Sequence, residues 1–351
     1  MRGLVRLLLA GVLGCLGGCE SLFFYPSKQI AHTPAELGLV YQDVRFYSAD
    51  NTALTGWFLP ASTQPAKATI VHVHGNAANI GDHVWAVRWL PAAGFNVLTF
   101  DYRGFGQSEG RPGLDGAVLD VQAALAYALA RPDVDPDRLV VFGQSLGGAL
   151  SLYQVAHSPL RARIRALVVD STFAGYRQIA SEKLAESWLT WPVQWLPEWV
   201  LSDRLAPRGA VSTIAPVPLL LVHGTADTVV PARHSEQLYA LAGSPRQLWL
   251  LPGVPHTAAF ELAVNRRRLL DWLDQALALP VSTPPAASAP PRNSAVSRVL
   301  LPIIQASSPE TQRLDHDPIV MHCSCLADAE CSGRQRRGAG NTPGAGLARL
   351  C

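Results

Sequence analysis

Short, almost entirely apolar runs recur along the middle of the chain and alternate with segments of helical periodicity. Runs of this kind are typical of strands buried on both faces of a parallel sheet. They lie at residues 44–48, 54–59, 68–74, 97–100, 139–142, 166–169, 219–222 and 248–251. Apolar positions at helical spacing occupy residues 113–130, 146–156, 231–241 and 258–279. This alternation, sustained over about 230 residues, predicts an α/β fold with a mostly parallel central sheet flanked by helices.

Composition separates a folded middle from a different C-terminal region. Hydrophobic residues make up 48% of the chain and charged residues only 16%, which favours a packed core. We assign the α/β domain to residues 44–279. Residues 280–351 begin as a linker rich in Pro, Ser and Ala and continue without periodicity, so we expect a disordered tail there.

The first residues have the features of an export signal. Arg2 and Arg6 supply positive charge, and a short apolar stretch at residues 7–16 precedes small residues. This stretch is shorter than the ~20 apolar residues of a membrane-spanning helix. We therefore predict a signal peptide at residues 1–18 and a tether at 19–43.

The end of this signal resembles a bacterial lipobox, Leu-Gly-Gly-Cys, and the resemblance implies that Cys19 becomes the lipid-modified first residue. Cys15 is the weaker alternative, and an uncleaved anchor or a buried apolar helix is the plainer one. Residue 20 is Glu rather than Asp, so the usual inner-membrane retention signal is missing. We expect a lipid-anchored protein of the bacterial cell envelope, facing the periplasm and held at the outer membrane.

Residues 172–215 interrupt the alternation of strands and helices. The segment lies between two predicted strands and is too long for a simple crossover, which predicts a small helical cap above the sheet. It contains four tryptophans, at positions 188, 191, 195 and 199. They could line an acyl pocket or touch a membrane. Because Pro192 and Pro197 break any single helix face, we favour simple packing of the cap onto the body.

The pattern Gly-x-Ser-x-Gly occurs twice, and its context separates the two copies. A nucleophile elbow is a sharp turn from a strand into a helix, with the serine at its tip. Ser145 follows the strand at 139–142 and directly precedes a helical pattern. Ser108 is followed by Arg-Pro-Gly, which is typical of a loop. We therefore predict that Ser145 is the nucleophile.

An acid and a histidine are expected after the serine, at later strand ends. Asp227 follows the strand at 219–222, and His256 follows the last strand. His256 would take the serine proton and return it to the leaving group, while Asp227 would orient the imidazole. Asp170 is the main rival for the acid, and Asp101 is a weaker one.

The tetrahedral intermediate needs two donors for its oxyanion. The backbone N–H of Leu146, directly after the nucleophile, is one candidate. The other is the backbone N–H of Asn76, in the turn after the strand at 68–74. A plain strand-ending turn is the alternative for this second segment.

Net charge and cysteine placement limit the partners. The formal charge is +2 and no basic patch dominates the middle, which argues against nucleic-acid binding. No cysteine lies between residues 20 and 322, so the predicted domain has no thiol nucleophile and no cysteine-bound metal. We expect no metal and no cofactor. The predicted partners are a small acyl substrate and, through the lipid anchor, a membrane, with a monomer as the expected state.

Four segments together resemble one group of α/β-hydrolases that contains protein depalmitoylases, other membrane-associated hydrolases and peptidase-like bacterial lipoproteins. They are His-Val-His-Gly-Asn-Ala at 72–77, Asp-Tyr-Arg-Gly-Phe-Gly at 101–106, Gly-Gln-Ser-Leu-Gly-Gly at 143–148 and Val-His-Gly-Thr-Ala-Asp at 222–227. The likeness covers roughly residues 19–278. It implies the α/β-hydrolase fold and a structural role for Arg103. The group usually carries glycine where this chain has Ala78, so the geometry of that loop is expected to differ.

These features predict a serine hydrolase that cleaves carboxylic esters or thioesters through an acyl-enzyme. Amide substrates share the same mechanism, so a peptidase-type hydrolase is one alternative. A catalytically silent binding or scaffold lipoprotein on the same fold is the other. The set Ser145, Asp227 and His256 favours the enzyme.

Overall fold

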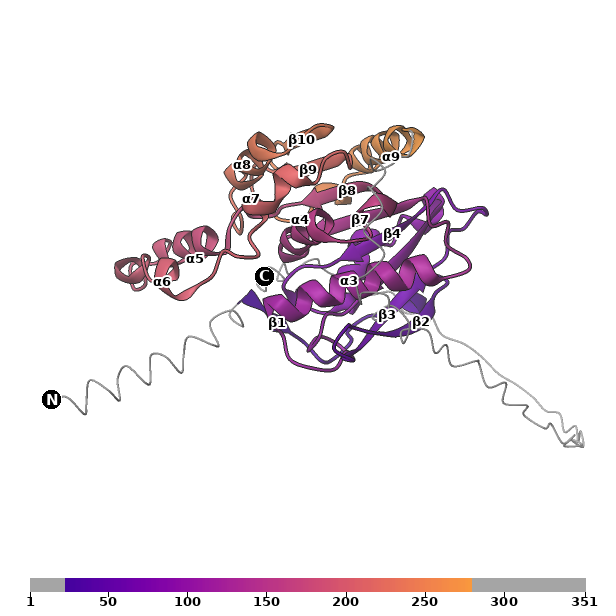
Figure 1. The fold of residues 1–351 in the computed structure, drawn as a ribbon, viewed down its shortest axis with the longest axis horizontal. Coiled ribbons are helices and arrows are strands. Elements are labelled where there is room, and N and C mark those ends of the chain that lie inside the picture. Colours follow the sequence, from indigo (N-terminus) through magenta and orange to yellow (C-terminus); the bar gives the residue numbers. More distant parts are fainter. Residues whose placement is uncertain (1–22, 280–351) are drawn as a thin grey trace, which may run out of the picture. The chain divides into compact units, whose positions relative to one another are not determined.

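The computed structural model describes residues 23–279, and within them an eight-stranded sheet organises the fold (Figure 1). The strand order is β10-β9-β8-β7-β4-β6-β3-β2. Strands β2 and β3 pair antiparallel, as do β3 and β6, and all other neighbours are parallel. The carboxyl ends of the parallel strands therefore meet at one edge, where such sheets place their sites. The predicted α/β-hydrolase fold is confirmed.

Each predicted strand forms, within two residues of its expected bounds. The strands are β2 (Gln42–Tyr47), β3 (Ala53–Leu59), β4 (Ala68–Val73), β6 (Phe95–Phe100), β7 (Leu139–Gln144), β8 (Ile164–Asp170), β9 (Leu219–Gly224) and β10 (Arg246–Leu251). The six residues of β4, like those of β7, are all buried. Such burial on both faces is the cause of their largely apolar sequence.

Helices cover both faces of the sheet. Core residues of α3 (Leu114–Ala130), α4 (Leu146–His157) and α8 (Arg233–Leu241) pack on one face, and those of α2 (Ile80–Val87) and α9 (Ala263–Ala278) pack on the other. Alternate residues of β7 join the two cores, since Val141 belongs to the first and Val140 to the second. Helix α2 was not predicted, and the closing helix is preceded by a short turn, η7 (Ala259–Glu261).

The domain begins earlier than the predicted residue 44. Phe24 is buried in the core, and β1 (Tyr25–Pro26) pairs in parallel with β5 (Ala77–Ala78). Asn79 fastens the same segment by donating to the carbonyls of Ser27 and Gln29. The segment assigned to a tether is therefore, from residue 23 onward, part of the folded body. Its irregular backbone carries no periodic signal, which is why the sequence pattern missed it.

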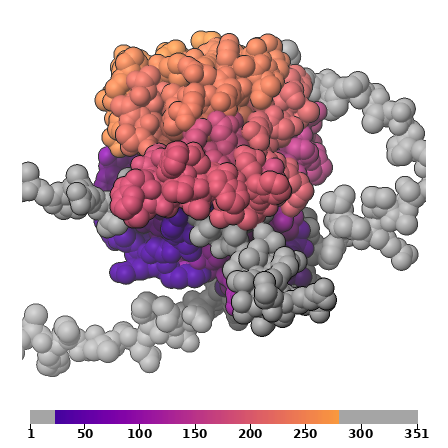
Figure 2. All heavy atoms as spheres, turned by 90° about the vertical axis from the view of Figure 1, so that its left-hand side faces the viewer, coloured from indigo at the N-terminus to yellow at the C-terminus, as the bar shows by residue number. Residues whose placement is uncertain are grey.

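The insertion between β8 and β9 consists of short helices. They are α5 (Tyr176–Ala185), η5 (Trp191–Val193), α6 (Pro197–Val200), α7 (Pro207–Ala210) and η6 (Val211–Thr213). The expectation that its tryptophans pack the cap onto the body is wrong. Trp188 is 82% exposed and Trp199 is 79% exposed, and Trp191 and Trp195 are also exposed. Figure 2 views the molecule from this side and shows the cap at its centre.

Several predictions fall outside residues 23–279. They are the signal peptide at 1–18, the lipid attachment at Cys19 with its alternative Cys15, and the linker and tail at 280–351. Among the helices of residues 23–279, none combines the length and apolar character needed to cross a bilayer.

Candidate active site

Ser145 lies at the tip of a tight turn between β7 and α4. Its backbone has φ 52° and ψ −119°, a region that side-chain-bearing residues avoid at a cost of about 1–3 kcal/mol. The turn is tight because α4 starts against the end of β4. A Cβ added to Gly147 would lie 2.0 Å from the carbonyl oxygen of Val73. The glycine of the pattern is therefore required by close packing.

His256 and Asp227 are hydrogen-bonded to each other. His256 Nδ1–H donates to Asp227 Oδ2 over 2.7 Å, which leaves Nε2 as the free acceptor of the ring. The other carboxylate oxygen accepts the backbone N–H groups of Val229 and Val230, both at 2.8 Å. Burial opposes ionisation of Asp227, but the hydrogen bonds from His223 and His256 hold its pKa well below the usual range. The carboxyl is therefore a fixed anion.

His223 is a second imidazole that contacts Asp227, and the sequence pattern did not predict it. Its ring is fully buried at the end of β9, and Nε2 lies 3.2 Å from Asp227 Oδ2 and 2.8 Å from the carbonyl of Val230. Ser235 Oγ lies 2.6 Å from Nδ1. The carbonyl requires Nε2 to carry the proton, so Nδ1 accepts from Ser235. Asp227 thus lies between two imidazoles. The motif His-Gly-Thr-Ala-Asp contained the signal, because it places His223 four residues before the acid.

Asp170, the rival acid, makes different contacts. Burial raises its pKa, while hydrogen bonds from Gln144 (3.1 Å) and Ser171 (3.0 Å) oppose that rise. Its backbone carbonyl accepts the N–H of Ser145 over 2.9 Å. No hydrogen bond joins this carboxyl to His256 within residues 23–279. Asp170 therefore supports the turn that carries Ser145.

The loop after β10 is fastened to the ends of β7 and β8. Thr257 donates its backbone N–H to Ser171 Oγ (3.0 Å), and its carbonyl accepts from Gln144 Nε2 (3.4 Å). Gln144 is itself fixed by His72, whose Nε2 lies 3.1 Å from the amide oxygen. The residues next to Ser145 and His256 in the sequence are thus in direct contact, which brings the two predicted residues to one place.

The turn after β4 lies beside Ser145. A Cβ added to Gly75 would lie 3.8 Å from the Cβ of Ser145, so the backbone passes close to the hydroxyl. Asn76 follows it, and the carbonyl of Asn76 accepts the N–H of Tyr25 (2.8 Å). Leu146 is the first residue of α4, and the first N–H groups of a helix have no partner within it. Both predicted oxyanion donors therefore lie next to the nucleophile turn.

A buried acid supports this turn from beneath. Asp101 Oδ1 accepts the N–H of Ile80 and lies 3.6 Å from His74 Nε2. His74 Nδ1 lies 2.8 Å from the carbonyl of Gly75 and so carries the ring proton, which makes Nε2 an acceptor. Burial raises the pKa of Asp101 to about 7. The unprotonated His74 Nε2 faces the Asp101 carboxyl, which is consistent with a protonated, neutral Asp101.

Known proteins are similar in sequence to this chain over most of the domain. The chain is 41% identical over 263 residues to an uncharacterized protein, YfhR, of Escherichia coli, covering 73% of this chain and 88% of that protein. It is 32% identical over 256 residues to the alpha/beta hydrolase domain-containing protein WAV2 of Arabidopsis thaliana, covering 69% and 81%. The family model described as serine aminopeptidase, S33, matches residues 64–214.

The chain belongs to the α/β-hydrolase superfamily. A solved esterase of Pyrococcus furiosus has the same fold, with a TM-score of 0.59 and 24% identity over 73% of this chain and 98% of that one. Acetyl xylan esterase 1 from Thermoanaerobacterium also matches, with a TM-score of 0.52 and 21% identity over 72% and 86%. These structures agree with the fold, and the identity to WAV2 confirms the predicted superfamily, so the protein is a hydrolase.

The second Gly-x-Ser-x-Gly of this hydrolase is a structural loop. Ser108 is buried, donates to the carbonyl of Asp101 (2.7 Å) and accepts the N–H of Thr55 (2.9 Å). Arg103, in the same loop, has the predicted tying role, because its guanidinium binds Asp120 and Asp50. No cluster of three or more His, Cys, Asp or Glu within residues 23–279 could hold a metal ion.

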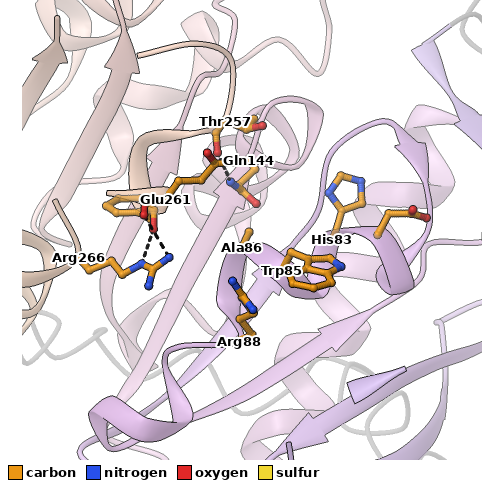
Figure 3. A pocket seen from close by; sticks show the side chains of 10 residues that line it. His83, Trp85, Ala86, Arg88, Gln144, Thr257, Glu261 and Arg266 are labelled. Atoms are coloured by element: carbon orange, nitrogen blue, oxygen red, sulfur yellow. Dashed lines mark hydrogen bonds between the residues drawn. The ribbon is translucent and has the colours of Figure 1, made fainter. Parts of the chain in front are cut away.

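A hollow of about 380 Å³ lies beside α2, and its lining does not include Ser145, Asp227 or His256 (Figure 3). It is lined by Gln144 and Thr257, the sequence neighbours of Ser145 and His256. Its other walls are largely polar or aromatic: Asp82, His83, Trp85, Ala86, Arg88, Phe260, Glu261 and Arg266. Arg88 stacks on Trp85 (4.4 Å from the ring centroid).

Proposed function

We propose that this hydrolase cleaves carboxylic esters or thioesters by nucleophilic catalysis, with Ser145 as the nucleophile, His256 as the general base and Asp227 as its orienting acid. The observation that carries the proposal is the 2.7 Å hydrogen bond between His256 and the buried Asp227, at the strand edge that also presents the strained Ser145. A serine hydroxyl is a weak nucleophile without such a base.

The reaction follows from the proton positions. His256 Nε2, the free acceptor, takes the proton of Ser145 as its oxygen attacks the carbonyl carbon. The resulting imidazolium faces the anion of Asp227, which stabilises it. His256 then gives the proton to the leaving alcohol or thiol. Water repeats the sequence on the acyl-enzyme and releases the acid.

The oxyanion would be held by the backbone N–H groups of Leu146 and Asn76. The position of Leu146 at the start of α4 and the position of Asn76 one residue after Gly75 support this assignment. Removal of one such donor typically costs about 2.7–4 kcal/mol of transition-state stabilisation.

A fluorophosphonate probe tests the nucleophile. The wild-type protein should be labelled, and Ser145→Ala should abolish labelling. Ser108→Ala is the matched control, because it removes the serine of an identical Gly-x-Ser-x-Gly pattern and should leave labelling intact. Labelling that persists in Ser145→Ala would refute Ser145 as the nucleophile, and no labelling of the folded wild type would favour the silent scaffold.

Amide hydrolysis is the second candidate, favoured by the match to the serine aminopeptidase model at residues 64–214. The names of the solved esterases favour ester substrates. A series of p-nitrophenyl esters and thioesters of increasing acyl length, compared with aminoacyl p-nitroanilides, separates the two. Esters or thioesters should be cleaved faster than anilides, and faster cleavage of anilides would reverse the assignment.

We also propose that the protein is a lipid-anchored monomer of the bacterial cell envelope, attached through Cys19 and facing the periplasm. The lipobox-like sequence before Cys19 supports this. The intact mass of the protein from a bacterial membrane fraction should correspond to a chain that starts at Cys19 with two or three acyl groups. An unmodified chain starting at residue 1 would refute the anchor.

A further inference from the structure

The cap presents a cluster of large apolar side chains to solvent. We call it the Trp ridge and define it as Trp188, Leu189, Trp191, Trp195 and Trp199. Their exposed fractions are 82%, 68%, 58%, 56% and 79%. Single exposed apolar residues are ordinary on protein surfaces, but five within twelve consecutive residues form a patch of the kind that marks a binding surface.

The cap is fixed to the body without the Trp ridge. Glu182 of α5 binds His234 (2.9 Å) and Arg233 (2.8 Å) of the body, and Lys183 donates to the carbonyl of Thr228 (3.0 Å). Tyr176 and Ile179 bury the inner side of α5. The side chains of the Trp ridge are therefore not needed to hold the cap on the body.

The chemistry of the surface favours a lipid interface as its occupant. Tryptophan is enriched where hydrocarbon meets water, because its ring is apolar and its N–H is polar. The indole N–H of Trp195 illustrates this, since it donates to the carbonyl of Pro192 (2.9 Å) at the surface. Residues 172–215 contain four basic and four acidic residues. Attraction to the surface would thus come from apolar contact and not from net charge.

The described part of the chain begins beside the cap. The ring of Phe23, the first described residue, packs on Phe173 (centroids 6.4 Å apart) and Tyr176 (5.2 Å) at the base of α5. The 22 preceding residues include the apolar stretch 7–16. Cys19 is four residues from Phe23, at most about 14 Å of extended chain. A membrane-attached N-terminus would therefore hold the cap near the bilayer.

We propose that the Trp ridge docks on the interface of a lipid bilayer. Its tryptophan rings would enter the headgroup region, next to the point where the N-terminal segment leaves the domain. Lys183 of the cap donates to the carbonyl of Thr228, the residue after Asp227. Through this contact, the sheet edge that carries the site would face the same membrane surface. This inference concerns docking and holds whichever bond the site cleaves.

Quenching by brominated lipid tests the contact itself, separately from anchorage. The full chain is reconstituted in phosphatidylcholine vesicles with and without dibromo-phosphatidylcholine, and tryptophan fluorescence is measured. We expect strong quenching in the wild type and its loss in Trp188→Ser/Trp191→Ser/Trp195→Ser/Trp199→Ser. Buried Trp57, Trp249 and Trp272 give the unquenched reference signal. High salt should leave the quenching unchanged.

Trp85→Phe is the control, because Trp85 is a half-exposed tryptophan on α2, outside the cap. It should leave most of the quenching in place. If the fourfold variant fails to fold, Trp188→Ser and Trp199→Ser alone should each reduce the quenching. A vesicle-bound wild type whose fluorescence is not quenched would overturn the proposal. So would light scattering that shows a dimer dissolved by the same substitutions, since a second copy would then cover the Trp ridge.

Discussion

The loops at the edge of the sheet and the cap above them differ in which side chains they bury and which they expose. At the strand ends, polar side chains such as His72, Asp170 and His223 are fully buried and hydrogen-bonded. In the cap, which is inserted between β8 and β9, the largest apolar side chains face solvent. The two regions are adjacent in sequence, because the cap begins directly after Asp170 and Ser171.

This difference indicates that the strand ends hold the reacting groups in place, whereas the cap surface is suited to bind a partner. Buried polar networks cost much free energy when one partner is lost, and in return they hold groups in one geometry. The exposed tryptophans contribute little to folding, so their sequence is free to suit a partner. Substitutions at the strand ends should therefore affect stability and chemistry together, whereas those in the Trp ridge should affect neither.

Asp227→Asn should have the largest effect. Loss of the anion removes the partner of His256 and favours the wrong imidazole tautomer, so kcat should fall by about 10⁴. Asp170→Asn is the matched control at the neighbouring strand end. Because burial raises the pKa of Asp170, a neutral amide should be tolerated there with a much smaller loss. Steady-state kinetics on one ester would check both, and the reverse order of effects would assign the acid to Asp170.

His223→Phe should impair both stability and activity. It leaves the carbonyl of Val230 and the hydroxyl of Ser235 without their partner, at about 1–3 kcal/mol for each buried group. Asp227 also loses one of its two imidazole contacts and is held less firmly against His256. Urea unfolding should show the loss of stability, and kcat/KM on one ester should fall as well.

His234→Phe serves as the comparison for this prediction. His234 is equally buried but contacts Ala174 and Glu182 instead of Asp227. It should lower the free energy of unfolding by a similar amount and change kcat/KM much less than His223→Phe does. Equal losses of kcat/KM in both variants would reduce His223 to a packing role.

Asp101→Asn should change how stability depends on pH. Because the folded carboxyl has its pKa raised by burial to about 7, folding takes up a proton between about pH 4 and pH 7. Wild-type stability from this group is therefore highest at low pH and falls as pH rises through that window. The amide has no such loss. Relative to the wild type, the variant should therefore gain about 3 kcal/mol of unfolding free energy between pH 5 and pH 8, measured by urea unfolding at both pH values.

Ala78→Gly should be mildly stabilising. Ala78 adopts φ 59°, in the left-handed region, which costs a residue with a Cβ about 1–2 kcal/mol. Glycine removes that cost but adds freedom to the unfolded chain, about 0.5–1 kcal/mol. The net gain should be below about 1 kcal/mol by thermal unfolding. A clear loss of stability would mean that the methyl group packs.

Trp188→Ser and Trp199→Ser should have the smallest effect on folding. Exposed positions of this kind usually change the free energy of unfolding by less than about 0.5 kcal/mol. Trp249→Ser, at a buried position of β10, should cost several times more. Comparable losses at the three positions would contradict the contrast between cap and body.

Much of the fold was predictable because burial on both faces leaves strong sequence signals. Strands such as β7 consist mostly of apolar residues, and glycines around Ser145 are required by contacts that no side chain permits. Helix α2 was missed for the opposite reason. It has only eight residues, and Gly81 and Asp82 in its first turn give no helical pattern.

Other features depend on contacts between distant segments. Asp170 and Asp227 both follow strand ends, and only the hydrogen bond of His256 distinguishes them. Likewise, exposure of the Trp ridge cannot be read from residue type, since tryptophan is usually well buried. The turns at Pro192 and Pro197 remove the periodicity that would have shown which side faces outward.

The parallel pair β1–β5 has a practical consequence for where the chain can be cut. Tyr25 and Ser27 bond to Asn76 and Ala78, so the stretch leading from the N-terminus is a brace on the loop beside Ser145. A truncated expression product that begins at residue 44 would lose this brace and leave Phe105, which packs on Phe24, uncovered. A product that begins at residue 23 keeps both contacts and is therefore expected to yield a working enzyme.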